Sequence, residues 1–135
     1  MPGYSGTPLL KKIGIKDGDR VLVVNDPGNF LDLLGDLPMG CSVVANGRAE
    51  IDVGVLFSTS AGDLKKRFVS TAKRLAQNGM LWIAWPKKAS GVPTDLNENF
   101  VREIGLAAGL VDTKVCAIDE TWSGLRFVIR LKDRK

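Results

Sequence analysis

Residues 51–85, IDVGVLFSTSAGDLKKRFVSTAKRLAQNGMLWIAW, contain the pattern that decides the fold. The apolar run at 51–57 predicts a buried strand, and the Ser-Thr-Ser at 58–60 offers three successive helix caps. Apolar side chains then recur at helical spacing over 62–77 until an Asn-Gly pair stops the helix. A second apolar run at 80–85 predicts another strand. Because parallel neighbours need a crossover, the stretch predicts one strand–helix–strand unit of a parallel sheet.

The preceding residues extend this alternation toward the amino terminus. Thr7 followed by proline predicts the start of a two-turn helix that stops at Gly14. A β-branched run at 20–24 predicts a strand buried on both faces. Asp26 is placed to cap a short helix over 27–35, where the next residue is a proline and the last a glycine. Residues 41–45 then predict a second strand, which Asn-Gly closes.

The following residues add one helix and a hairpin. Thr94 is the predicted cap of a helix that ends before Gly109. Residues 110–118 and 125–131 have the composition of strands. The six residues 119–124 between them are few enough for a hairpin.

This order of elements predicts an α/β protein with three layers, in which helices cover both faces of a mostly parallel six-stranded sheet. Numbered along the chain, the strands are expected in the order 2-1-3-4-6-5, with the last strand antiparallel. Residues 1–135 form one Rossmann-like domain in this interpretation. The whole string resembles a shortened class I methyltransferase fold that lacks one strand–helix unit between its second and third strands.

The amino-acid composition excludes several classes of function. The chain has 135 residues, of which 44% are hydrophobic and 25% charged, and it has no apolar run of the length that a membrane span needs. It contains no histidine, so Ser-His and Cys-His catalysis and His-ligated metal sites are excluded, and no metal site is predicted. The net charge of +4 favours anionic partners mildly, and a nucleic-acid partner is not favoured.

Two cysteines bear on where the protein works. Cys41 and Cys116 lie in apolar segments without the CxxC spacing, so we expect reduced, buried side chains on opposite edges of the sheet, too far apart to bridge. The first seven residues have no apolar core behind a basic start, which predicts that no secretory signal is present. The expected localisation is therefore cytoplasmic.

The topology also predicts where a ligand would bind. In open α/β sheets, ligands bind beyond the carboxyl ends of the strands, where the winding direction reverses. The segments expected at this rim are 25–30, 58–60, 85–94 and 119–124, and each contains polar groups. The candidate ligand-binding residues are Asn25, Asp26, Asn29, Ser58, Thr59, Lys87, Lys88, Ser90, Thr94, Asp95, Asp119, Thr121 and Trp122.

The loop after the first strand bears on the cofactor. A methyltransferase-like fold has a glycine-rich turn there, which lets the backbone approach the cofactor closely, whereas this chain has Asn-Asp-Pro-Gly. Asp26 is either a structural cap or a ligand contact. No acidic residue follows the second strand to bind the ribose hydroxyl groups of a cofactor, and Asn46 is the nearest substitute. S-adenosylmethionine is thus a cofactor that the fold suggests and the loop disfavours.

Several rim residues have more than one interpretation. Lys87 and Lys88 either hold an anionic group by charge-assisted hydrogen bonds or are solvated. Asp119 either pairs with one of these lysines, acts as a base, or stabilises a turn. Trp85 either packs under the helices or stacks on a ligand.

The same holds for the basic side chains that crowd the long helix. These side chains either bind the phosphate groups of a nucleic acid or are simply exposed to solvent. They are Lys65, Lys66, Arg67, Lys73 and Arg74.

Three stretches also carry a resemblance to a family: NDPGNF at 25–30, LWIAWPKKASGVPTDL at 81–96 and DETWSGLRFVIR at 119–130. Together they are similar to the domain-of-unknown-function family 3052. The resemblance implies a compact cytoplasmic bacterial protein with a Rossmann-like fold, and it brings no established activity, cofactor or catalytic residue.

The sequence is compatible with three hypotheses about the function. The leading hypothesis is a noncatalytic or weakly catalytic binding module that holds a small anionic ligand or a partner near Lys87, Lys88 and Asp119. The first alternative is an S-adenosylmethionine-dependent methyltransferase with an atypical glycine loop. The second is a nucleic-acid interaction module that uses the basic helix 62–77.

Overall fold

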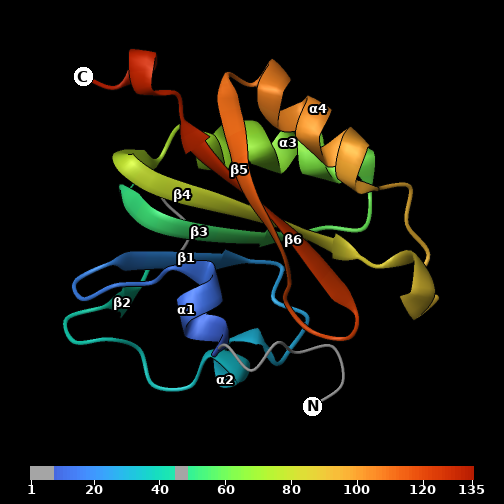
Figure 1. Cartoon of the computed structure of the whole chain (residues 1–135), viewed down its shortest axis with the longest axis horizontal. Coiled ribbons are helices and arrows are strands. Elements are labelled where there is room, and N and C mark those ends of the chain that lie inside the picture. Colours follow the sequence, from blue (N-terminus) through green and yellow to red (C-terminus); the bar gives the residue numbers. More distant parts are fainter. Residues whose placement is uncertain (1–7, 45–48) are drawn as a thin grey trace.

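The computed structural model describes residues 8–44 and 49–135 and contains one six-stranded sheet in the order β2-β1-β3-β4-β6-β5 (Figure 1). In chain order the strands are β1 Arg20–Val24, β2 Ser42–Val43, β3 Ile51–Phe57, β4 Leu75–Pro86, β5 Leu110–Ala117 and β6 Trp122–Ile129. Strands β2, β1, β3 and β4 pair in parallel, whereas β6 is antiparallel to both of its neighbours, β4 and β5. The predicted strand order and the antiparallel last strand are confirmed.

In the described residues, four α-helices cover the sheet in two layers. They are α1 Leu9–Ile13, α2 Phe30–Leu34, α3 Ala61–Ala72 and α4 Glu98–Ala107, and two short 3-10 helices, η1 Lys88–Ser90 and η2 Leu131–Asp133, follow β4 and β6. Helices α1 and α2 contribute buried side chains to one core cluster and α3 and α4 to the other, one on each face of the sheet (Figure 1). The architecture is the predicted three-layer arrangement.

The central strands hold the two layers together. Strand β4 is buried continuously from Leu81 to Pro86, because both of its faces are covered. Trp82 is fully buried, and its indole Nε1 donates a hydrogen bond to the Ile13 carbonyl at 2.9 Å, which ties α1 to β4. On the other face, the rings of Phe68 and Phe127 pack edge to face with centroids 5.4 Å apart.

The predicted helix over 62–77 ends five residues early, at Ala72. Leu75 instead begins β4 and pairs with Ile51, and the register then shifts through a bulge before Met80 pairs with Val53. Leu75 is 6% exposed and belongs to the same core cluster as α3, so its burial suits either a last helical turn or a strand. Helical spacing alone does not separate the two conformations, and pairing with β3 decides between them.

Three other predicted boundaries are wrong by a few residues. Helix α4 begins at Glu98 with Asn97 as its cap, since the Asn97 side chain accepts a hydrogen bond from the Phe100 amide at 2.9 Å, and Thr94 is not the cap. Helix α2 begins at Phe30 rather than at residue 27. Strand β6 covers 122–129 rather than 125–131, because residues 122–124 extend its ladder with β4.

The ends of the short second strand and of the first helix are only partly described. Strand β2 has two residues, so the predicted strand over 41–45 is wrong at Cys41 and Val44, and Ala45, with Asn46 after it, lies outside the described residues. Thr7, the predicted cap of α1, also lies outside them. Only residues 44–50 connect β2 with β3, as expected for a methyltransferase-like fold that lacks one strand–helix unit.

Both cysteines are free thiols. Cys41 precedes the edge strand β2 and Cys116 lies in β5 at the opposite edge, as expected from the strand order. Both are half-buried rather than buried, because an edge strand leaves its side chains partly in contact with solvent. In the part of the chain that the structure describes, no helix has the length and apolar character to cross a membrane.

We expect Gly105→Ala to lower the free energy of unfolding by about 1–3 kcal/mol, because a methyl group there would overlap the ring of Phe127. Gly62→Ala is the matched control in α3. Its added methyl would meet only Ser60 Oγ, at 4.0 Å, so helix propensity should stabilise that variant by up to about 1 kcal/mol. Urea unfolding of the two variants measures the difference. Stabilisation by both substitutions would contradict the described packing of α4 on β6.

Candidate functional site

The segments at the carboxyl ends of β1, β3 and β4 and the β5–β6 hairpin meet at one rim of the sheet. The backbone amide of Lys87 donates to the Thr121 carbonyl at 2.7 Å, which joins the end of β4 to the hairpin. The Asn25 side-chain amide donates to the Phe57 carbonyl at 3.2 Å, which joins the end of β1 to the end of β3. Asn25 therefore holds the loop in place, with its backbone in the left-handed region at φ 58°.

The segment after η1 is bound to the start of α3. The Thr94 hydroxyl donates to the Thr59 carbonyl at 2.7 Å, and an Asp95 carboxylate oxygen accepts from the Ala61 amide at 2.8 Å. Ser60 accepts from the Asp63 amide one turn into α3. Two side chains from different segments thus satisfy amides that the helix itself leaves without partners.

The Asp26 carboxylate occupies the start of α2. It accepts hydrogen bonds from the backbone amides of Gly28 at 2.8 Å, Phe30 at 3.0 Å and Leu31 at 3.3 Å. Burial on its own would raise the pKa of the Asp26 carboxyl, but these amides outweigh it and hold the pKa below its usual value. The structural interpretation of Asp26 as a cap is therefore the one that its contacts support.

This arrangement bears on the cofactor of methyltransferase-like folds. Backbone amides after the first strand are the donors that such a loop offers to an anionic ligand group. Here an internal carboxylate already accepts from three of them, and it adds a negative charge at the same place. The residues of this loop do not fit S-adenosylmethionine in that manner.

A hollow of about 590 Å³ lies between the end of β4 and the segment that leads to α4. It is lined by Trp85, Pro86, Lys88, Gly91, Val92, Pro93, Thr94, Asp95, Leu96 and Asn97. Its volume is within the range of small-molecule sites in proteins, roughly 300–1,000 Å³. Apolar side chains form much of its wall.

Most polar side chains of this hollow already have partners. Thr94 and Asp95 bind the loop before α3, and Asn97 caps α4. Lys88 is exposed, and its ammonium group has no partner among the described residues. Lys88 is therefore the cation of this hollow that is available to an anion. Ser90 instead donates to the Lys87 carbonyl at 2.7 Å within η1.

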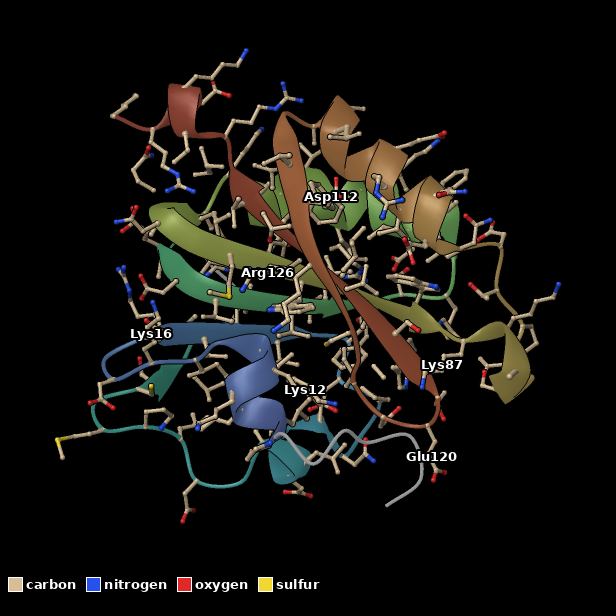
Figure 2. The ribbon with its side chains drawn as sticks, viewed as in Figure 1. Lys12, Lys16, Lys87, Asp112, Glu120 and Arg126 are labelled. Atoms are coloured by element: carbon tan, nitrogen blue, oxygen red, sulfur yellow. The ribbon has the colours of Figure 1, made fainter. Side chains whose placement is uncertain are left out.

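A second, smaller hollow of about 290 Å³ lies between α2 and the hairpin and is lined by Asn29, Leu33, Asp119, Glu120 and Thr121. Two carboxylates line it, which disfavours an anion there. One Asp119 oxygen accepts from the amides of Thr121 and Trp122, both at 2.8 Å, so Asp119 stabilises the turn. Within the described residues it forms no ion pair with Lys87 or Lys88. Figure 2 shows Lys87 beside the start of β6 and Glu120 pointing away from the sheet.

Three predicted rim residues are mainly structural. Ser58 is buried, and its hydroxyl donates to the Ser60 carbonyl at 3.1 Å. Trp122 packs edge to face on Phe57, with ring centroids 5.0 Å apart. Trp85 is 5% exposed and belongs to the core on the α3 side, so most of its ring packs under the helices and only a part lines the larger hollow.

The predicted residues are thus brought to one rim, and six of the thirteen line one of two separate hollows. Lys88, Thr94 and Asp95 line the larger one, and Asn29, Asp119 and Thr121 line the smaller one. The sequence interpretation missed the apolar wall of the larger hollow. Pro86 and Pro93, which lie at the two ends of this segment, could have indicated an apolar wall from the sequence.

The basic face of the long helix is also divided. The Arg67 guanidinium pairs with Asp63 at 2.8 Å, and the Lys65 ammonium lies 5.5 Å from the centroid of the Phe100 ring. Lys73 and Arg74 follow the last residue of α3. The five basic residues therefore do not form one continuous helical face.

Metal and thiol chemistry receive no support at this rim. The described residues contain no group of three His, Cys, Asp or Glu side chains that could hold a metal ion. Burial raises the pKa of the Cys116 thiol, although Lys12, Lys114 and Arg126 lie close enough to oppose the shift. A neutral thiol is a weak nucleophile.

The strand order, the antiparallel β6 and the rim at the strand ends define a Rossmann-like α/β protein whose fold resembles that of methyltransferases. Residues 40–131 match the family described as "Protein of unknown function (DUF3052)". These residues make up more than half of the chain, and the chain belongs to this family. No curated protein matches the sequence of the chain.

Solved structures with a similar fold include methyltransferases. The SAM dependent methyltransferase from Aquifex aeolicus has a TM-score of 0.62 and 16% identity, with 90% of this chain and 88% of that chain covered. The magnesium protoporphyrin IX methyltransferase from Synechocystis PCC 6803 with bound SAM has a TM-score of 0.61 and 10% identity, with 90% and 74% covered. The Aeropyrum pernix fibrillarin with natively bound S-adenosyl-L-methionine has a TM-score of 0.56 and 14% identity, with 93% and 70% covered. At these identities the likeness shows the fold alone.

Replacing Asp26 by alanine should lower the free energy of unfolding at pH 7 by about 0.5–2 kcal/mol, because three amides lose their acceptor. Since the folded protein holds the pKa of Asp26 below its unfolded value, this stabilisation is present above about pH 4 and is lost as the pH falls further. Urea unfolding at pH 7 and pH 2.5 measures the change. Asp26→Asn is the control, because an amide oxygen accepts hydrogen bonds without titrating. A difference between wild type and Asp26→Ala that grows at low pH would contradict the assignment.

Proposed function

We propose that the protein is a noncatalytic or weakly catalytic binding module that holds a small anion with an apolar body in the larger hollow. The observation that carries the proposal is one exposed ammonium group, Lys88, at a hollow whose walls include Trp85, Pro93 and Leu96. An apolar wall would receive the body of the ligand, and the ammonium its anionic group by charge-assisted hydrogen bonds.

The same hollow offers little for catalysis. Its titratable side chains are Lys88 and Asp95, and Asp95 is engaged at the first amide of α3. The chain contains no histidine to activate a hydroxyl or thiol group. These features support a binding role over a reaction.

A methyltransferase role is the alternative that the fold suggests, because structural neighbours such as the Aeropyrum pernix fibrillarin contain bound S-adenosyl-L-methionine. The loop after β1 supports the opposite conclusion for this chain, since Asp26 accepts from the amides that would face the cofactor. A nucleic-acid role for the α3 face lacks a supporting observation, because Arg67 is paired with Asp63 and α3 ends before Lys73.

The test uses phenyl phosphate, which combines an anionic group with an apolar ring, and follows amide and indole signals by ¹⁵N NMR. We expect a saturable shift of the Trp85 indole signal and of amides at 91–97. Lys88→Gln should weaken binding about tenfold or more, since a hydrogen bond to a charged group contributes roughly 1.5–3 kcal/mol.

Lys66→Gln is the matched control, because Lys66 is also an exposed lysine and lies on α3 outside the hollow. It should bind phenyl phosphate as the wild type does. Equal weakening in both variants, or shifts confined to residues outside the hollow, would show that the proposal is wrong.

A further inference from the structure

Cationic side chains gather at the end of the sheet opposite the candidate site. They follow α3 or β6 in the chain, and we call them the basic end: Lys73, Arg130, Lys132, Arg134 and Lys135. In Figure 1 the C-terminal end of the chain lies near the start of β4, whereas the end of β4 leads to the candidate site on the other side. The basic end and the two hollows are therefore separate surfaces.

The first part of β4 lies beside both parts of the basic end. The Lys135 amide donates to the Gln77 side-chain oxygen at 2.9 Å, which attaches the C-terminal residues to the first part of β4. Lys73 lies four positions before Gln77, directly after α3. Because Val128 pairs with Met80, Arg130 continues past β6 along the same part of β4.

Within the described residues, no cation of the basic end forms an ion pair with a carboxylate, in contrast to three arginines elsewhere. Arg20, Arg67 and Arg102 each form ion pairs with Asp or Glu side chains. By comparison, the Arg134 Nε donates to the Ile129 carbonyl at 3.0 Å, and a carbonyl oxygen carries no net charge that would cancel the guanidinium.

The other members show the same lack of carboxylate partners. The Arg130 Nε is buried and has no hydrogen-bond partner among the described residues. Lys73, Lys132 and Lys135 are exposed and form no ion pair within residues 8–44 and 49–135. Asp133 lies between Lys132 and Arg134 and offsets part of this charge, but the five cations leave the basic end with an excess of positive charge.

This distribution changes what the modest net charge of +4 implies. Net charge averages over the whole surface, whereas an anionic polymer responds to the charge density of the surface that it contacts. None of the aromatic side chains that the structure describes is exposed, so the basic end offers no platform on which single-stranded bases could stack. Its arginines and lysines suit phosphate groups instead.

We propose that the basic end binds the phosphate backbone of a nucleic-acid duplex without reading its sequence. The partner is a polymer of regularly spaced phosphates, since several cations at one end of the sheet can then release several counterions together. The proposal is independent of the ligand in the larger hollow, because no residue belongs to both surfaces.

The test measures binding of a fluorescein-labelled 20-base-pair DNA duplex by anisotropy between 50 and 200 mM salt. If most of the five cations contact phosphates, log Kd should rise against log salt with a slope of about 3 to 5. Lys73→Gln combined with Lys132→Gln should lower this slope by about 1.8, because each lost phosphate contact removes about 0.9. It should also weaken binding at the lowest salt at least tenfold.

Lys11→Gln combined with Lys66→Gln is the matched control, because it removes two exposed lysines of α1 and α3 and changes the net charge equally. It should change duplex affinity less than twofold. Absence of duplex binding, equal losses in both double variants, or binding to phosphatidylserine vesicles without binding to the duplex would overturn the proposal. Phenyl phosphate titration of both double variants keeps the two surfaces distinguishable, since neither should affect the larger hollow.

Discussion

The Asp26 carboxylate at the start of α2 is the interaction on which the functional interpretation depends. It accepts hydrogen bonds from three backbone amides, and in doing so it fills the position where an open α/β fold offers amides to a ligand. A carboxylate in this place stabilises the loop and repels a second anion. The strand order thus resembles that of the similar methyltransferase structures, whereas three amides of the loop after β1 are bound to the protein's own carboxylate.

The other end of the rim is arranged differently. There Thr94 and Asp95 attach the segment after η1 to the start of α3, and a hollow with a partly apolar wall lies between this segment and the end of β4. Lys88 stands at its margin with an ammonium group that no described residue neutralises. Charge is thus distributed unevenly: Asp119 and Glu120 line the hairpin hollow, Lys88 and Asp95 line the larger hollow, and the five cations of the basic end lie at the opposite end of the sheet.

The sequence predicted the sheet correctly because its strands are continuous apolar runs, and a parallel arrangement follows from the helices between them. It misplaced the end of α3 because Leu75 is buried equally well in a helix or in a strand, and only its pairing with Ile51 distinguishes them. The rim residues were found from strand ends, but their division between two hollows was not. Whether Asp119 binds a lysine or two backbone amides depends on the conformation of the hairpin, which residue types alone do not determine.

The most direct test of the central claim is equilibrium dialysis of radiolabelled S-adenosylmethionine against the wild-type protein at pH 7. Because Asp26 already satisfies the amides after β1, the account predicts no saturable binding up to millimolar ligand. Stoichiometric binding with a micromolar Kd, while Asp26 keeps its hydrogen bonds to the loop amides, would contradict the account. It would favour the methyltransferase alternative instead.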